Sequence, residues 1–236
     1  SFEIANTVKT ADALTVLITP DQSTASQLEY ELRFFLNSAD LIWHFPDWET
    51  LPYDLFSPHH DIVSERLALL SRLKHMTEGV LIVSMPTLFN RLAPVSFLNH
   101  SGFCFKTGDT LNIDTLSKQL VDATYHRVDQ VFEHGEFAIR GSIVDLFPMG
   151  SESPYRLELF DDCIETIRSF NPETQRTIEK ISEMNCLPAK EFPFDDAAMA
   201  ETIIDNKLDN LIGVLNYPLE DTKQHTTFSS LFDFGE

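Results

Sequence analysis

Residues 136–170 read EFAIRGSIVDLFPMGSESPYRLELFDDCIETIRSF, and this stretch decides the fold of the second half of the chain. Apolar and polar side chains alternate, with the period of a half-buried β-strand, in four short runs at 136–140, 142–147, 155–160 and 164–170. Turn-forming residues separate the runs, among them Pro148-Met149-Gly150 and Asp161-Asp162. The pattern predicts antiparallel strands joined in chain order, which is a β-meander.

The predicted meander starts before residue 136 and follows a helix. Residues 127–132 also alternate, and His134-Gly135 is expected to turn the chain back into the next strand. Apolar residues at helical spacing over 112–123 precede these strands. One helix followed by a meander is typical of an α+β domain.

The first hundred residues show a different pattern, in which buried strands alternate with amphipathic helices. Short apolar runs at 14–19, 41–45 and 80–83 are typical of strands that are buried on both faces. Two helical stretches separate them, the first capped by Ser23 and the second over 61–73. Strands and helices in alternation predict a parallel sheet with right-handed crossovers.

The fold class that we expect is therefore α/β plus α+β, a parallel α/β domain followed by an antiparallel meander. The boundaries of the two domains and of an acidic return segment are expected at 1–102, 103–190 and 191–236.

Composition excludes several classes of protein. The 236 residues include 17 Lys and Arg against 37 Asp and Glu, a formal net charge of −20, which opposes binding to DNA or anionic lipid. A hydrophobic content of 43% excludes wholesale disorder, and no apolar run is long enough to span a membrane. Three cysteines that lie far apart fit a reducing compartment, so we expect a cytoplasmic protein. Because the chain starts at Ser1, we expect it to be a piece of a longer protein.

The sequence offers no catalytic or cofactor-binding constellation. Neither the glycine-rich loop of a P-loop nor the GxGxxG of a dinucleotide site is present. His59-His60-Asp61 could suggest a metal site, but we interpret it as a loop whose Asp61 caps the following helix. We therefore expect no enzyme activity, no cofactor and no metal in these residues.

Two arginines on the predicted meander are the candidate functional residues. Arg156, Glu158 and Phe160 share one face of their strand, and Arg140 shares a face with Glu136 on another. Arginine and aromatic side chains on an exposed sheet are typical of a protein-binding patch. Cross-strand pairing of the arginines with the two glutamates on a solvated face explains the same pattern. The residues alone leave both interpretations open.

Several longer motifs resemble the N-terminal region of the bacterial transcription-repair coupling factors (Mfd). The motifs run through both predicted domains, and they are FPDWETLPYD at 45–54, FSPH at 56–59, SERL at 64–67, RVDQV at 127–131, GEFAIRG at 135–141, DLFPMGS at 145–151, and FDD at 160–162. The resemblance implies a module similar to domains 1a, 2 and 1b of the excision-repair subunit UvrB. Residues 1–102 would then be a degenerate helicase-like domain 1a, residues 103–190 domain 2, and residues 191–236 the start of domain 1b.

The same resemblance implies a partner and a site. Domain 2 of this family binds the damage-recognition ATPase UvrA, through positions that match Arg140, Arg156 and Phe160. Glu136 and Glu158 are expected to orient the two arginines. The C-terminal domain of the same protein is expected to mask this face, while RNA polymerase and DNA bind only to domains outside these residues.

The function that the resemblance implies is a non-catalytic adaptor, which recruits UvrA to stalled transcription complexes in nucleotide excision repair. Two alternatives remain open. One is an autoinhibitory module that restrains the translocase motor of the same protein, and the other is a residual nucleotide-binding domain.

Overall fold

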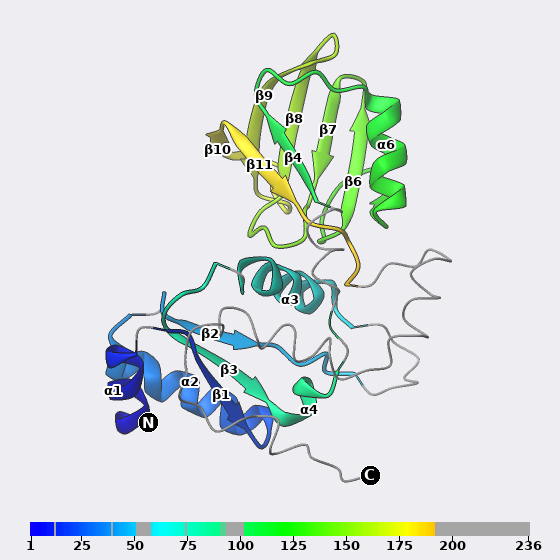
Figure 1. Cartoon of the computed structure of the whole chain (residues 1–236). Helices are drawn as coiled ribbons and strands as arrows, with labels where there is room; N and C mark the ends of the chain where they lie inside the picture. Colours follow the sequence, from blue (N-terminus) through cyan, green and yellow to red (C-terminus); the bar gives the residue numbers. More distant parts are fainter. Residues whose placement is uncertain are drawn as a thin grey trace, which may run out of the picture.

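The structure is a computed structural model of the chain, with two groups of elements. Helix α3 of the first group lies between the sheet of that group and the second group (Figure 1). It describes residues 1–11, 13–38, 40–50, 58–73, 75–90, 92 and 102–191. Apart from Glu191, the predicted return segment 191–236 lies outside the described residues.

The first group is built on a three-stranded parallel sheet. Its strands are β1 (Thr15–Thr19), β2 (Ile42–Phe45) and β3 (Val80–Ser84), in the order β1-β3-β2. The helices are α1 (Phe2–Thr10), α2 (Gln22–Leu36), α3 (His60–Leu73) and the short α4 (Met85–Leu88). Every residue of the central strand β3 is buried, as expected for a parallel strand with helices on both sides. The parallel α/β pattern is thus confirmed, whereas its helicase-like character stays a prediction.

Two predicted helix caps are wrong by a residue or two. The N-cap of α2 is Asp21 rather than Ser23, because the extended backbone of Asp21 lets its Oδ1 accept a hydrogen bond from Thr24 N at 2.7 Å. Helix α3 already begins at His60, so Asp61 lies in its first turn. There the Asp61 carboxylate pairs with the ring of His134, 2.8 Å away, instead of capping the helix.

The second group contains a six-stranded sheet. Its strands, in the order β10-β9-β8-β7-β6-β5, are β5 (His126–Arg127), β6 (Glu136–Arg140), β7 (Ile143–Leu146), β8 (Tyr155–Phe160), β9 (Cys163–Phe170) and β10 (Thr177–Ile181). The five strands from β6 to β10 are antiparallel neighbours in chain order, which confirms the predicted meander.

Strand β5 differs from the prediction. It is two residues long and pairs with β6 in parallel, with His126 opposite Glu136. A hairpin at His134-Gly135 would have required an antiparallel pair. Instead, residues 128–135 form a loop whose Val131 is completely buried in a small cluster with Ala138, so the chain enters β6 in the direction of β5.

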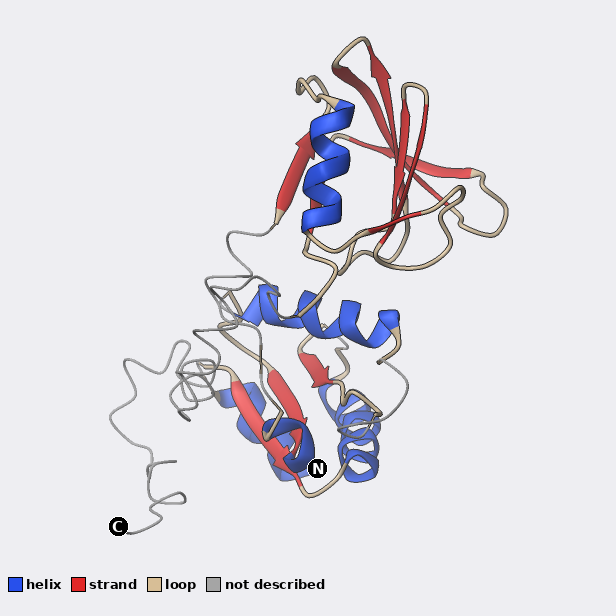
Figure 2. Cartoon of the chain, turned by 90° about the vertical axis from the view of Figure 1, so that its right-hand side faces the viewer, coloured by secondary structure: helices blue, strands red, loops and turns tan. Residues whose placement is uncertain are grey.

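One face of the six-stranded sheet is covered and the other is largely open. Helix α6 (Ile113–Asp122), capped by Asn112, and a two-stranded sheet of β4 (Phe103–Lys106) and β11 (Glu183–Cys186) share a hydrophobic cluster with the covered face. Figure 2 shows α6 lying along one side of the sheet. Among the described residues, the opposite, open face carries the small buried cluster of Val131, Ala138, Phe147 and Phe170. Polar side chains occupy most of its other positions, together with Ile143 and the exposed Phe160.

Candidate protein-binding face

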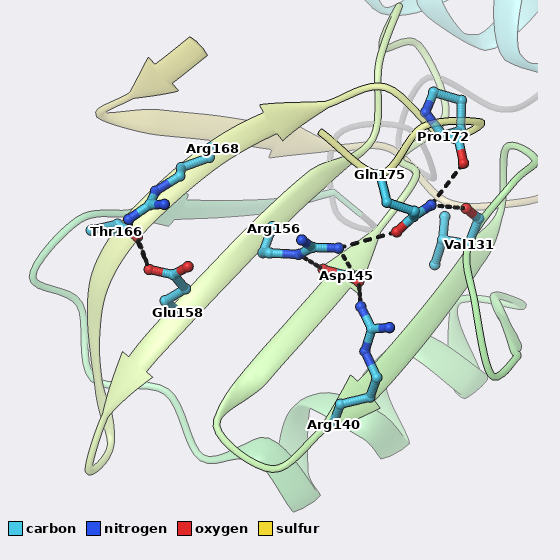
Figure 3. A network of polar contacts seen from close by, with 9 residues as sticks. All are labelled: Val131, Arg140, Asp145, Arg156, Glu158, Thr166, Arg168, Pro172 and Gln175. Carbon is cyan, nitrogen blue, oxygen red and sulfur yellow. Dashed lines mark hydrogen bonds and ion pairs between the residues drawn. The ribbon is translucent and has the colours of Figure 1, made fainter. Parts of the chain in front are cut away.

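The open face gathers charged side chains from four adjacent strands. The register places Asp145 of β7 opposite Arg156 of β8, and Arg156 opposite Arg168 of β9. On β6, Ala138 lies opposite Asp145, so Arg140 shares this face two residues further along. Figure 3 shows the four side chains on the same side of the sheet. The sheet register therefore brings the two predicted arginines to one carboxylate.

Asp145 is the centre of this cluster and is only 1% exposed. Its Oδ1 accepts from Arg156 Nε at 2.6 Å, and its Oδ2 accepts from Arg156 Nη2 at 2.9 Å and also from Arg140 Nη2 (Figure 3). A buried carboxylate needs such charged donors, since it has lost its hydration. Conversely, the hydrogen bonds and the charge of Asp145 raise the pKa of the Arg156 guanidinium.

Arg156 is held on further sides. Its Nη2 donates to Gln175 Oε1 at 3.2 Å, and its guanidinium lies 4.7 Å from the ring centroid of Phe170. Gln175 in turn donates to the carbonyl oxygens of Pro172 and Val131. The side chain of Arg156 is consequently only 19% exposed, whereas that of Arg140 is 47% exposed.

Glu136 and Glu158 do not orient the two arginines as expected. Glu158 Oε2 accepts from Thr166 Oγ1 at 2.9 Å and from Arg168 Nη2 at 3.0 Å, because Thr166 is its cross-strand neighbour. Glu136 Oε2 accepts from two backbone N–H groups of the loop before β6, those of Phe132 and Glu133. Glu158 acts on Arg156 only through its charge, and the direct contacts come from Asp145.

Phe160 lies at the end of β8 and is 70% exposed. Strands β6 and β8 run in the same direction, because each is antiparallel to β7 between them. Arg140 and Phe160, the last residues of these strands, therefore lie at the same end of the sheet. Arg156 lies four residues before Phe160, about 13 Å along the strand. The open face thus presents an exposed arginine and an exposed phenylalanine beside a shielded arginine.

Sequence reasoning missed Asp145, Arg168 and Gln175. A signal for Asp145 was present, since it is the polar residue within the apolar run Ile143–Leu146. Arg168 shows the period-two spacing of β9, in which Thr166 and Phe170 take the same face. Gln175 lies in the turn before β10, and no local pattern indicates its contact with Arg156.

Neither a metal site nor a membrane-spanning helix is found in the parts of the chain that the structure describes. There, no group of three or more His, Cys, Asp and Glu side chains is placed to hold a metal ion. No helix among these residues has both the length and the apolar character needed to cross a lipid bilayer.

Comparison with known proteins identifies the family. Residues 103–192, from β4 to just beyond β11, match the family described as the UvrB interaction domain. The chain is 50% identical over 184 residues to the transcription-repair-coupling factor of Escherichia coli, and 50% identical over 183 residues to that of Haemophilus influenzae. Each of these matches covers 78% of this chain. The chain belongs to the transcription-repair-coupling factor family.

More distant members of the family match as well. The factor of Bacillus subtilis is 32% identical over 175 residues, which is 74% of this chain. All three matches cover only a small part of the relative, 16% of the two closer factors and 15% of the Bacillus one. The chain thus spans about one sixth of the length of the coupling factors that it matches.

Proposed function

We propose that this chain is a non-catalytic adaptor region of a bacterial coupling factor, and that it binds UvrA through the open face of β6–β9. In this role it would recruit UvrA to stalled transcription complexes during nucleotide excision repair. The observation that carries the proposal is the pair of arginines held by one buried carboxylate, inside the segment that matches the UvrB interaction domain.

The chemistry of the face supports binding of a protein. Arginine forms bidentate contacts with carboxylates, and arginine and aromatic residues are enriched at the energetic centres of interfaces. Arg140 and Phe160 are both exposed at one end of the sheet, so one partner surface can contact both. On a chain with a net charge of −20, this concentration of arginines is a local exception.

The charge of the chain supports the part of the proposal that concerns DNA. A net charge of −20 opposes the release of counterions that drives binding to DNA, so we assign DNA to other parts of the factor. We propose that RNA polymerase is also bound by other parts. We further propose that the C-terminal domain of the factor competes with UvrA for the same face. We also propose that the chain is located in the cytoplasm and that it binds no cofactor.

A binding experiment with a matched control tests the proposed function. Purified UvrA would be titrated onto the immobilised chain and onto two variants, Arg140→Ala and Arg33→Ala. Arg33 of α2 is 48% exposed and pairs with one carboxylate, Glu29 at 2.7 Å, so it matches Arg140 in exposure and in lost charge. We expect Arg140→Ala to weaken binding and Arg33→Ala to leave it unchanged. Equal effects of both changes, or no binding by the unchanged chain, would contradict the proposal.

A further inference from the structure

We infer that Asp145 is a positioning residue, which holds Arg140 and Arg156 for an acidic partner surface, and that Arg140 binds the carboxylate of that partner. This inference rests on the proposed binding of UvrA to the open face. It adds a division of roles between the two arginines and the chemistry that the partner must present.

The position of Asp145 is unusual for a residue that serves only the fold. Its neighbours on β7, Val144 and Leu146, are buried apolar side chains, and Asp145 itself is 1% exposed. Buried ion pairs are weak contributors to stability when compared with apolar residues of similar size. A buried carboxylate does, however, fix the geometry of the donors around it, and both donors here are arginines of the strands that flank β7.

The donors of Arg156 are largely engaged within the chain. A guanidinium group has five N–H donors. In Arg156 the Nε donor and one Nη2 donor reach the two oxygens of Asp145, and a further Nη2 contact reaches Gln175. With Nε and Nη2 engaged, neither edge of the guanidinium has two free N–H groups for a second carboxylate. Only the Nη1 donors remain free of contacts among the described residues. Arg156 consequently fixes the network and contributes charge.

Arg140 has the opposite arrangement. Among the residues that the structure describes, its side chain makes one polar contact, from Nη2 to Asp145 Oδ2. The second N–H of Nη2 remains available together with the donors of Nε and Nη1, and 47% of the side chain is exposed. The free Nη2 N–H and the N–H beside it form one edge with two parallel donors, which match the two oxygens of a carboxylate. Arg140 is thus the residue that can bind an acidic side chain of the partner in bidentate geometry.

Positioning and simple charge attraction predict opposite outcomes for Asp145→Asn. The change removes one negative charge from the face, so charge attraction to an acidic partner alone would strengthen binding. The amide that this change introduces cannot accept from both guanidinium groups as the carboxylate does. Arg156 keeps Gln175 and Phe170. Arg140, in contrast, loses its charged partner, so UvrA must then order Arg140 at an entropic cost. We expect the second effect to dominate because Asp145 is the only polar contact of Arg140 among the described residues.

The experiment compares UvrA binding by the full chain and by Asp145→Asn, at about 0.15 M salt so that long-range attraction is screened. We expect the affinity to fall about tenfold or more. In an NMR spectrum, the Nε–H signal of Arg156 should lose its distinct shift in the variant, while the amide signals of the sheet stay dispersed. Unchanged or tighter binding would overturn the inference.

Two further variants separate positioning from stability and from the proposed function. In an Arg140→Ala background, Asp145→Asn should weaken binding by less than about twofold, since its main effect passes through Arg140. A full tenfold loss in that background would show that Asp145 serves the fold in general. Arg140→Lys keeps the positive charge but loses the two parallel N–H donors, so it should weaken binding about tenfold. Unchanged binding would overturn the assignment to Arg140. If Arg140→Ala itself has no effect, the proposed binding face is wrong.

Discussion

Arg66 and Glu191 lie 125 residues apart and form a bidentate ion pair, with Nε and Nη2 of Arg66 at 2.9 and 3.0 Å from the two carboxylate oxygens. Both side chains are buried, at 0% and 2% exposure. Arg66 Nη1 also donates to Pro46 O at 2.7 Å, and the guanidinium lies 4.5 Å from the ring centroid of Phe45. Glu191 follows β11, the last strand of the second group. The ion pair therefore joins the end of the second group to α3, and Arg66 joins α3 to the residue that follows β2.

This ion pair makes Glu191→Ala a test of the junction. Removal of one partner leaves a buried charge uncompensated, so we expect the free energy of unfolding to fall by about 3–5 kcal/mol. Urea denaturation followed by circular dichroism measures this change. The control is Glu183→Ala, which breaks the exposed Lys106–Glu183 pair, at 57% exposure on both sides. That change should cost less than about 1 kcal/mol, and similar losses in both variants would contradict the expectation.

Gly79 and Gly108 share a backbone angle φ of +95° but differ in their surroundings. A Cβ at Gly79 would lie 2.5 Å from Trp43 Cζ3 and 2.6 Å from Leu41 O, whereas nothing lies within 4 Å of one at Gly108. Gly108→Ala should therefore cost only the backbone strain, about 1–3 kcal/mol. Gly79→Ala should cost about 1–3 kcal/mol more, because the packing around Trp43 must shift. Denaturant midpoints compare the two, and an equal loss would show that the clash relaxes freely.

Local patterns sufficed for the three strands of the parallel sheet and for β6 to β9 of the meander, but not for β10, β11 or the pairing of β5. The buried run at 80–83 and the alternation at 136–170 are visible in the sequence because side-chain direction repeats every two residues. Strand β5 was predicted wrongly because the burial of Val131 beneath the open face is a tertiary contact. The pairing of β4 with β11 joins Phe103 to Cys186, and no local period reports a contact across that separation.

For the candidate site, the sequence predicted which face of a strand each arginine takes but not which residue it contacts. Period-two spacing placed Arg140 and Arg156 on strand faces, but a choice of carboxylate partner needs the register between strands. The register sets Asp145 opposite Arg156 and Thr166 opposite Glu158, so the nearest acid along the same strand is not the contact. Register depends on the lengths and shapes of the connecting turns, which alternation does not specify.

The three cysteines should differ sharply in reactivity. Cys104 and Cys163 are exposed, whereas Cys186 is buried and its thiol donates to Tyr125 Oη at 2.9 Å. Burial raises the pKa of Cys186 to about 12, and only the thiolate reacts with disulfide reagents. At about pH 8, we expect two thiols to react in the native chain and the third only after unfolding. Three equally fast reactions would contradict the burial of Cys186.

The raised pKa of Cys186 also implies that the stability of the chain depends on pH. The pKa of Cys186 is higher in the folded chain than its ordinary value of 9.0, so the folded state holds the proton over this interval. Its contribution to stability is therefore complete below about pH 9 and is lost as the pH rises toward about 12. The free energy of unfolding should fall over this range, and it should fall less steeply in Cys186→Ala. Equal slopes would show that Cys186 is not the group responsible.

The chain should bind neither nucleotide nor duplex DNA. With a net charge of −20 it cannot neutralise many phosphates, so we expect negligible duplex affinity at about 0.15 M salt. Fluorescence anisotropy with a labelled duplex, and calorimetric titration with ATP and magnesium, measure the two affinities. Micromolar duplex binding that weakens with added salt would contradict this expectation, as would a saturable signal with ATP.

A substitution at Phe160 should affect UvrA binding without affecting the stability of the fold. Because its side chain is 70% exposed in the free chain, Phe160→Ala should change the free energy of unfolding by less than about 0.5 kcal/mol. If Phe160 fills an apolar pocket of UvrA beside the carboxylate bound by Arg140, the same change should cost about 2 kcal/mol of binding, or about 30-fold in affinity. The matched control is Phe34→Ala on α2, which removes another phenylalanine, 79% exposed, from the other sheet's helices. Phe34→Ala should leave UvrA binding unchanged. An equal effect of the two changes, or none from Phe160→Ala, would place the partner's apolar contact elsewhere on the chain.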